Sequence, residues 1–575
     1  KFSGNYQLID NQFDPGPRIP NLEQINGVLA FTDSGISIER ITGRLLGGPV
    51  SIHSTDALDG NLRLSAAGKV NLDNLHESAP GAAGGGAQFW TRHVSGSTDW
   101  LASITIRNKL TDISIESTLL GITSDLPEPF SKAATDIAPL RLERKATGPD
   151  RDILSIGYGR LLSAKIKRTR DDGGTYHPER GAVNFGAAPN SQPDKGGITL
   201  TGTLPHLNLD RWRLLSKQLG NEPASTMSVT SINVHIDALD FLGKRFNDVG
   251  LDADKKERLW YSTVESKEIN GGITWNPSGS GKIVARLNRL SIPDGSLAKQ
   301  SAIMETQHEK ALPALDVAAD TFILGNIQLG KLELVANQEE SDWHIERLRV
   351  TNPDSSIMVH GLWKNNTATP QVQAALTLES SDIGKFLTRL GQDDRVTRGS
   401  GKLEGVLSWQ GVPQSIDYST LSGTFQLRAR RGQFPRFEPG IGRLFGIFNL
   451  RSLPRRITLD FRDVFSEGFG FDDISGNVKI DNGVASTDGL RIDGPSARVV
   501  INGQMSLEAE TQKLHIQVTP SYGLVSPVVG MASVIASAAL KNPTTSKEYD
   551  ISGTWADPVV TRISLQAQEA AEPQR

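Results

Sequence analysis

Apolar and polar residues alternate along most of this chain with a period of two. Ile36 and Ile38 flank a serine, and Ile232, Val234 and Ile236 alternate with asparagine and histidine. Alternation over four to eight residues places apolar side chains on one face of a β-strand and polar side chains on the other. Glycine, asparagine and proline separate the runs, so the pattern predicts short turns between antiparallel strands.

Three segments repeat the same order of strand, turn, strand, loop and strand. They begin at Ile25, Ile327 and Ile474, and a weaker copy runs from Phe246 to Trp275. Self-similarity of this kind indicates a repeat architecture instead of unrelated domains. The sequence therefore predicts a mainly β fold, an elongated and curled antiparallel β-sheet repeat array with a few short helices.

Two of those helices are expected directly after strands. Both lie in segments that begin with a strand, continue through Leu-Asx or Glu-Ser and end at glycine, 204–220 and 376–391. Asp210 and Ser381 are the expected N-caps, because short polar side chains accept hydrogen bonds from the first free backbone N–H groups. Gly220 and Gly391 are the expected helix ends.

Composition excludes several classes of protein. The chain has 575 residues and no cysteine, so disulfides and cysteine metal sites cannot form. The absence of cysteine also suits an oxidising compartment such as the bacterial periplasm. With 61 Lys+Arg against 65 Asp+Glu, the chain is not a globally basic nucleic-acid binder.

The sequence contains no complete motif for catalysis. The ten histidines show no HExxH spacing, and neither a phosphate-binding loop nor a nucleophile elbow is complete. We therefore expect no catalytic residue, no metal site and no cofactor, and we interpret the chain as a protein that is not an enzyme. A basic run from Arg160 to Arg170 either meets lipid headgroups or forms a solvated outer strand face, which is the commoner outcome.

Two apolar segments near the C-terminus differ from the strands. The first, 438–450, is flanked by arginines, and the second, 514–540, contains no charged residue. We expect a strand ending at Pro520 and then an apolar helix from about Pro527, together with an amphipathic helix in the first segment. The candidates for contact with a membrane or a groove mouth are Leu444, Phe445, Ile447, Phe448, Val528, Val529, Met531, Val534 and Ile535.

The C-terminal part resembles the YhdP family of AsmA-like proteins. The segments that carry the resemblance are 434–471, 494–507, 518–530 and 549–560. The resemblance implies a bridge-like lipid transfer protein whose sheet forms a hydrophobic groove for phospholipid acyl chains. It also implies a periplasmic location in a Gram-negative bacterium, an inner-membrane anchor that this chain lacks, and outer-membrane contact at the C-terminal region. Partner proteins stay open, and no nucleic-acid partner is expected.

The groove would be lined by the apolar members of the alternating runs. These candidates are Ile36, Ile38, Val50, Ile52, Ile104, Ile106, Ile232, Val234, Ile236, Leu376, Leu378, Phe425, Leu427, Val478, Ile480, Val499, Ile501, Leu514, Ile516 and Val518. The expected division is a β-groove region over 1–430 with a flexible loop near 78–88, a C-terminal cap with helices over 431–565, and a frayed tail over 566–575.

Two other functions remain compatible with the alternation. A structural or adhesive β-repeat protein would pack the same faces on a dry core without cargo. A carbohydrate-acting enzyme would require two carboxylates facing one cleft, and a single sequence cannot exclude such a pair.

Overall fold

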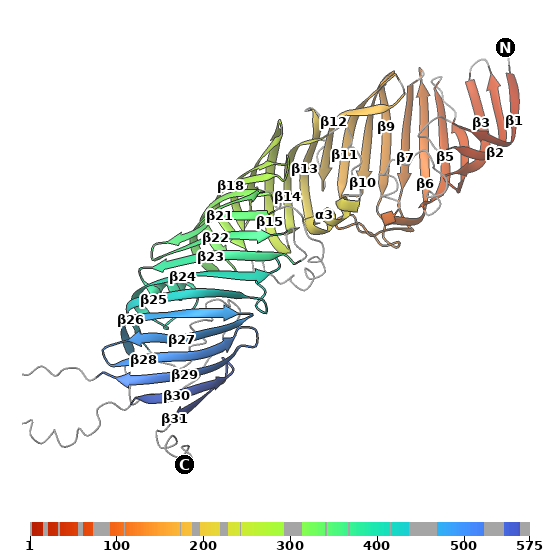
Figure 1. Ribbon diagram of the computed structural model, residues 1–575. Helices are drawn as coiled ribbons and strands as arrows, with labels where there is room; N and C mark the ends of the chain where they lie inside the picture. Colours follow the sequence, from red (N-terminus) through yellow and green to blue (C-terminus); the bar gives the residue numbers. More distant parts are fainter. Residues whose placement is uncertain are drawn as a thin grey trace, which may run out of the picture. The chain divides into compact units, whose positions relative to one another are not determined.

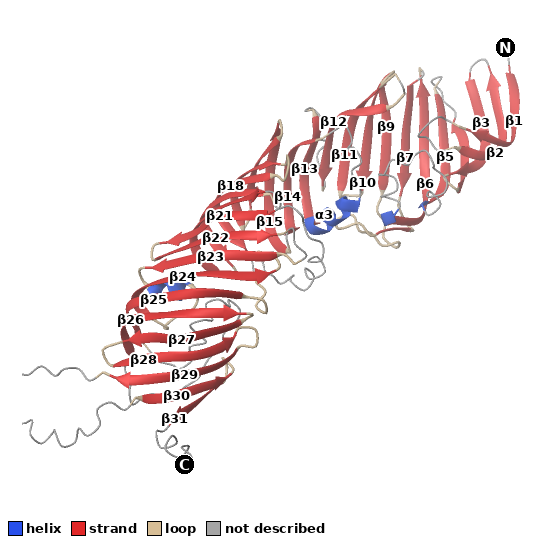
Figure 2. Cartoon of the chain, in the orientation of Figure 1, coloured by secondary structure: helices blue, strands red, loops and turns tan. Residues whose placement is uncertain are grey.

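Strands dominate the computed structural model of the chain (Figure 2). The structure describes residues 3–563 except 15–20, 33–34, 56–60, 73–91, 109, 173, 187–195, 219–227, 242, 293–312, 340–341, 366–368, 414–415, 436–467 and 522–545. Its strands are assigned to one sheet, and it divides into two compact units. Unit 1 comprises residues 1–274 and 295–303, and unit 2 comprises residues 275–294 and 304–575.

Unit 1 contains the strands up to the division point, which falls within β17. Many of these strands, among them β1, β2, β3 and β9 to β15, are labelled in Figure 1. They are β1 (Ser3–Phe13), β2 (Leu22–Thr32), β3 (Gly35–Leu45), β4 (Gly48–Thr55), β5 (Leu62–Asn71), β6 (Val94–Arg107), β7 (Leu110–Ser117), β8 (Ile122–Ser124), β9 (Leu140–Gly148), β10 (Arg151–Tyr158), β11 (Leu162–Arg170), β12 (Tyr176–Phe185), β13 (Gly197–Asn208), β14 (Val229–Phe241), β15 (Lys244–Lys256), β16 (Leu259–Glu265) and β17 (Ile269–Asn276).

Unit 2 contains the remaining described strands. They are β18 (Lys282–Ile292), β19 (Ala314–Leu324), β20 (Ile327–Glu339), β21 (Asp342–Asn352), β22 (Ser355–Lys364), β23 (Gln371–Ser380), β24 (Thr397–Gln410), β25 (Ser422–Phe434), β26 (Phe469–Asp481), β27 (Val484–Asp493), β28 (Ala497–Ser506), β29 (Thr511–Pro520), β30 (Lys547–Gly553) and β31 (Pro558–Ile563). Within the described residues β1 pairs only with β2 and β31 only with β30, so the sheet is not closed into a barrel.

The alternating runs form strands as predicted, and most neighbours are antiparallel. The three sequence repeats correspond to β2–β4, β20–β22 and β26–β28, each an antiparallel set. The turn between β26 and β27 contains Asn482 and Gly483, both with positive φ, as a tight hairpin requires.

The expected antiparallel pairing holds for most neighbours, but the sheet is mixed. The pairs β12–β13, β13–β14 and β18–β19 are parallel. A parallel neighbour requires the chain to return to the end of the sheet where the previous strand began, so longer segments separate these strands. The segment between β13 and β14 contains a helix. The alternation of apolar and polar residues within a strand does not indicate that the chain returns in this way.

Both expected short helices are present, but their caps differ from the prediction. Helix α3 (Leu209–Gln218) follows β13, and Asn208 accepts a hydrogen bond from the N–H of Arg211 at 2.9 Å. Helix α5 (Ile383–Arg389) follows β23, and its N-cap is Asp382 instead of Ser381. Gly391 has positive φ and ends α5 as predicted, whereas Gly220 lies outside the described residues.

The C-terminal region expected as a cap continues the sheet where it is described. Strand β26 pairs with β25, and the ladder runs on to β31. The amphipathic and apolar helices, the loop near 78–88 and the tail 566–575 all fall outside the described residues. The compact units divide near residue 275, a boundary that the sequence did not indicate.

Candidate functional site

One face of unit 1 carries a continuous row of aliphatic side chains, and we call this face the inner face. Paired residues lie on the same face of a sheet, so the register from β4 to β15 defines the row. Its members are Ile52, Ala66, Ala102, Ile115, Leu142, Ile156, Ala164, Val183, Leu200, Ile232 and Ala253. With neighbouring strands about 4.8 Å apart, the row runs roughly 50 Å along the sheet.

The larger side chains of this row are partly exposed. Ile52, Ile115, Leu142, Ile156 and Ile232 are intermediate in exposure, whereas the row's three alanines on β5, β11 and β15 are buried. A neighbouring row of Val50, Gly68, Trp100, Ser117 and Leu140 widens the apolar surface. Unit 1 therefore presents a wall that is aliphatic and still accessible from one side.

The inner face of unit 2 follows the same rule but is more deeply buried. Its rows include Ala429, Ile474, Ile492, Val499 and Val518, which are paired in turn from β25 to β29 and are at most 7% exposed. At the opposite ends of strands β21 to β24 a row of Trp343, Trp363, Val372 and Trp409 is also buried. Unit 2 therefore packs most of its inner face as a core.

A cavity remains between α5 and the inner face of unit 2. Its volume is about 160 Å³, and α5 contributes Ile383, Phe386 and Leu387 to it. The other lining residues, from the segment 396–403 and β23 to β28, are Leu378, Ser380, Val396, Gly401, Lys402, Leu403, Phe425, Leu427, Ala429, Phe434, Phe471, Ile474, Val478, Leu490, Ile492 and Ile501. A cavity of about 150 Å³ with such a lining stays dry and accepts benzene, so this one suits a short length of hydrocarbon.

The cavity brings together five of the groove candidates, Leu378, Phe425, Leu427, Val478 and Ile501. Sequence reasoning missed its members from the helix and from irregular strand positions. Strand β26 changes the face it buries between Phe471 and Ile474, which are both buried although three positions apart. A strict period of two cannot register such a shift.

The remaining groove candidates lie on strands with varied exposure. Ile38, Val50, Val234, Ile236, Ile480, Val499, Leu514, Ile516 and Val518 are buried, and Ile52, Ile104, Ile106, Ile232 and Leu376 are partly exposed. Ile36 is 46% exposed. The nine candidates for membrane or mouth contact, Leu444 to Phe448 and Val528 to Ile535, lie outside the described residues.

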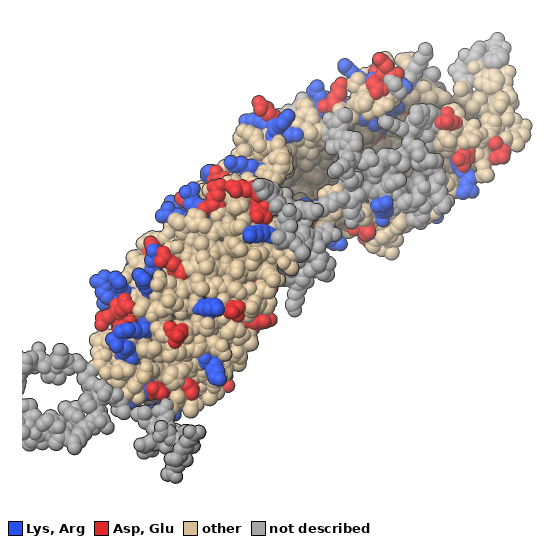
Figure 3. Space-filling model, viewed as in Figure 1, with Lys and Arg blue, Asp and Glu red and all other residues tan. Residues whose placement is uncertain are grey.

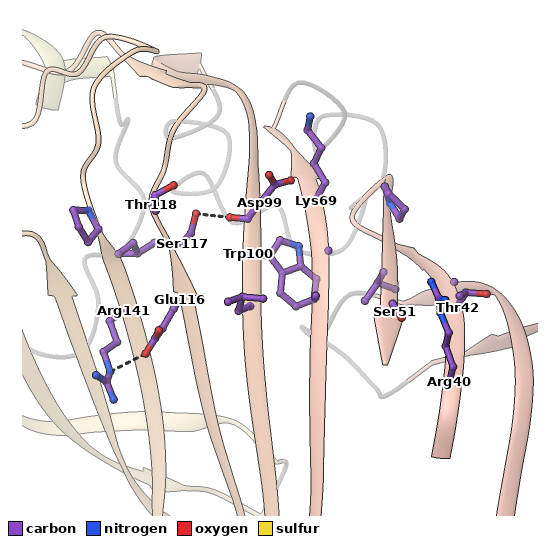
Figure 4. Close-up of a pocket in the computed structure, with 18 residues that line it drawn as sticks. Arg40, Thr42, Ser51, Lys69, Asp99, Trp100, Glu116, Ser117, Thr118 and Arg141 are labelled. Carbon is purple, nitrogen blue, oxygen red and sulfur yellow. Dashed lines mark hydrogen bonds and ion pairs between the residues drawn. The ribbon is translucent and has the colours of Figure 1, made fainter. Parts of the chain in front are cut away.

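A second hollow lies on unit 1, and both apolar and polar residues line it (Figure 4). Its volume is about 1010 Å³, and Ser51, Ala67, Leu101, Glu116 and Arg141 follow one cross-strand row along it. Along the strands these residues alternate with members of the aliphatic rows, so their side chains leave the opposite face of the sheet. Arg141 Nε lies 3.5 Å from Glu116 Oε1. The hollow is also lined by Val50, Gly68, Trp100, Ser117 and Leu140 of the neighbouring row, so it includes part of the apolar wall.

Charged groups border the inner face of unit 1 where β13 and β14 end. His206 Nε2 lies 2.8 Å from Asp240 Oδ2, and Arg245 contacts the same carboxylate at 2.7 and 2.9 Å. The hydrogen bond with Glu128 raises the pKa of His206, although burial opposes the rise. The hydrogen bond from Arg245 lowers the pKa of Asp240.

On the face of the molecule in Figure 3, basic and acidic side chains are interspersed.

The described residues contain no helix long and apolar enough to cross a membrane. They also contain no group of three histidines or carboxylates placed to hold a metal ion.

A family comparison identifies the protein's relatives. The family model described as YhdP protein matches residues 1–560. The chain belongs to the YhdP family. Its sequence resemblance, which was clearest over the C-terminal residues, therefore extends over nearly the whole chain.

One curated YhdP relative is Intermembrane phospholipid transporter YhdP of Escherichia coli (strain K12). It is 23% identical over 619 aligned residues, which cover 98% of the chain and 46% of that protein. The chain thus spans less than half the length of this YhdP relative. No solved structure matches the chain.

Proposed function

We propose that this chain holds phospholipid acyl chains along its apolar inner faces and forms part of a route for phospholipids between membranes. The observation that carries the proposal is the accessible aliphatic row of unit 1, which continues without a charged residue from Ile52 on β4 to Ala253 on β15. The cavity under α5 supplies a second apolar surface in unit 2. The named activity of the E. coli relative supports the same conclusion.

The energetic role of such a wall follows from the hydrophobic effect. Exposing an acyl chain of about 16 methylenes to water costs on the order of 13 kcal/mol, at about 0.8 kcal/mol for each methylene. Partly exposed Ile, Leu and Val side chains replace water around the chain and remove most of that barrier. The protein therefore moves its cargo without a chemical step, in the periplasm between an inner-membrane anchor and the outer membrane.

A pair of neighbouring positions on β6 tests the proposal. Ile104 points to the inner face and Ser103 to the opposite one, because adjacent residues of a strand alternate. A photo-crosslinking residue placed at position 104 of the intact protein should capture phospholipid when the variant is produced in cells. The same residue at 103 should capture at least tenfold less, and mass spectrometry of the adducts measures both.

Equal capture at both positions would show that lipid does not follow the inner face. Capture at neither position, with both variants folded, would favour the alternative of a structural β-repeat protein with a dry core. In unit 2, Leu427 and Gln426 of β25 offer the same pairing, because Leu427 lines the cavity and Gln426 is exposed.

A further inference from the structure

A charged cluster interrupts the apolar inner face of unit 1 at one end of strands β9 to β12. It comprises Arg144, Asp152, Arg168 and Tyr176, one from each strand. Arg144 pairs with Leu154, and Leu154 with Ile166, in the row beside the aliphatic row. Residues two apart on a strand share a face, so Asp152 and Arg168 point the same way as these aliphatic neighbours.

The contacts in the cluster hold both guanidinium groups in place. Arg168 meets Asp152 with two bonds of 2.8 Å, from Nε to Oδ1 and from Nη2 to Oδ2. Arg144 Nε donates to Asp152 Oδ2 at 2.7 Å, and its Nη2 donates to the Tyr176 hydroxyl at 2.6 Å. Both guanidinium carbons lie about 5 Å from the centre of the Tyr176 ring, as cation–π contacts do.

The accessible part of the cluster is positive. The Asp152 side chain is 0% exposed, whereas those of Arg144 and Arg168 are 26% and 22% exposed. Arginine stays protonated in proteins, so two positive charges face one negative charge. The nearby acids Asp112 and Glu143 are paired with Arg107 and Arg141. A ligand approaching along the inner face therefore meets guanidinium groups and not the carboxylate.

The two other buried aspartates among the described residues lack this excess of positive charge. Asp354 pairs with the single Arg389 at 2.9 Å. Asp240 has Arg245 and His206, but Glu128 contacts the same histidine. A purely structural role needs only enough positive charge to balance the buried carboxylate. The second arginine beside Asp152 exceeds that need.

We infer that Arg144 and Arg168 bind the phosphate of a phospholipid headgroup whose acyl chains lie on the aliphatic row of unit 1. Guanidinium groups match phosphate oxygens in geometry, and groups already fixed by other contacts lose little entropy on binding. The adjacent Leu154 and Ile166 favour a phosphate that carries hydrocarbon over free phosphate. The inference rests on the proposed function and names the headgroup contact within it.

Two substitutions that change the net charge of the cluster in opposite directions test the inference in the intact protein. Arg144→Gln removes the excess charge and leaves the paired bonds between Asp152 and Arg168. Asp152→Asn keeps the side-chain shape and increases the excess charge. Binding of dioctanoyl phosphatidylglycerol should weaken about tenfold in the first variant and stay equal or strengthen in the second, since a hydrogen bond to a charged group is worth about that factor. A structural cluster would instead weaken binding in both.

Controls separate the charge from the fold and from the apolar wall. Lys167→Gln removes the same charge from the other face of β11 and should leave binding unchanged, and Arg144→Lys should retain most of it. Octyl glucoside, which has no phosphate, should bind Arg144→Gln and the unchanged protein alike. Thermal unfolding confirms that each variant is folded.

The outcomes also separate this inference from the proposed function. Unchanged phosphatidylglycerol binding by Arg144→Gln would overturn the headgroup contact, while binding of both amphiphiles would leave acyl-chain carriage standing. Failure of both amphiphiles to bind the unchanged protein would overturn the proposed function itself. Displacement of the lipid by millimolar inorganic phosphate would assign the arginines to free phosphate and overturn the lipid assignment.

Discussion

The inner faces of units 1 and 2 have the same alternating pattern and differ in what covers them. In unit 1 the larger side chains of the aliphatic row stay partly exposed, and charged clusters lie where the strands end. In unit 2 Phe469, Val499 and Ile501 are 0% exposed, and tryptophan and phenylalanine side chains belong to the buried hydrophobic clusters. One sequence rule thus produces both an accessible wall and a packed core.

The largest effect is expected when an isoleucine is replaced by aspartate, once in the packed core of unit 2 and once on the accessible wall of unit 1. Ile516→Asp places a carboxylate in the core of unit 2, where Ile516 is 4% exposed, and should cost about 4 kcal/mol or more of unfolding free energy. Ile104→Asp in unit 1 puts the carboxylate at a partly exposed position, so the protein should stay folded but bind lipid poorly. Denaturant unfolding and lipid binding of both variants measure the contrast.

Equal destabilisation by the two aspartates would mean that the inner face of unit 1 is a core too. A folded Ile104→Asp variant with normal lipid binding would remove Ile104 from the lipid path. Ser103→Asp on the opposite face is the matched control, and it should change neither stability nor binding.

Much of the fold could be predicted because alternation is a local property. The runs at Ile104, Val234 and Ile516 form strands as expected, and their pairing follows from short turns. The parallel pairing of β13 with β14 could not be predicted, because it depends on the path of the chain between the two strands, which the alternation within a strand does not specify.

The candidate site was predicted only in part, for a related reason. Arg168 belongs to the basic run that the sequence favoured as an outer strand face, yet it shares the inner face with Ile166. Only the register with β10 shows that Asp152, sixteen positions away, is its partner. The residues of α5 that line the cavity show no strand period, so alternation could not identify them.

An intermediate effect is expected at two glycines over which an aromatic side chain lies. A Cβ on Gly405 of unit 2 would overlap the carbonyl oxygen of Thr424 and the ring of Phe425, which is buried. Gly405→Ala should therefore cost about 1–3 kcal/mol of unfolding free energy. A Cβ on Gly68 of unit 1 would lie 2.8 Å from both the Trp100 ring and the Pro49 oxygen.

The partly exposed Trp100 ring has more room to move than Phe425, so Gly68→Ala should cost less than Gly405→Ala. Denaturant unfolding measures both variants. Gly470→Ala is the control, because no atom lies within 4 Å of its added Cβ. A larger cost at Gly68 than at Gly405 would contradict the contrast between an accessible wall and a packed core.

The smallest expected effect concerns pH and residues 124–132, which we call the closing segment because its Glu128 contacts His206 near the end of β13. Glu128 belongs to a segment whose backbone is tied by reciprocal hydrogen bonds between Ser124 and Lys132, and it contacts His206. Because the folded pKa of His206 is raised, this contact stabilises fully below the unfolded value of about 6.5 and is lost as pH rises through the folded pKa. Asp240, whose pKa is lowered, loses its contribution only in acid, as pH falls through its folded pKa.

Protection of the Ser124 and Lys132 amides should therefore decrease from about pH 6.5 upward, after correction for intrinsic exchange. The change should be about 1 kcal/mol or less, the usual net worth of one hydrogen bond. His206→Gln should remove this pH dependence, while amides of the packed strand β28 in unit 2 should show none in either protein. A decrease that survives in His206→Gln would assign the pH dependence to another group and leave the closing segment independent of His206.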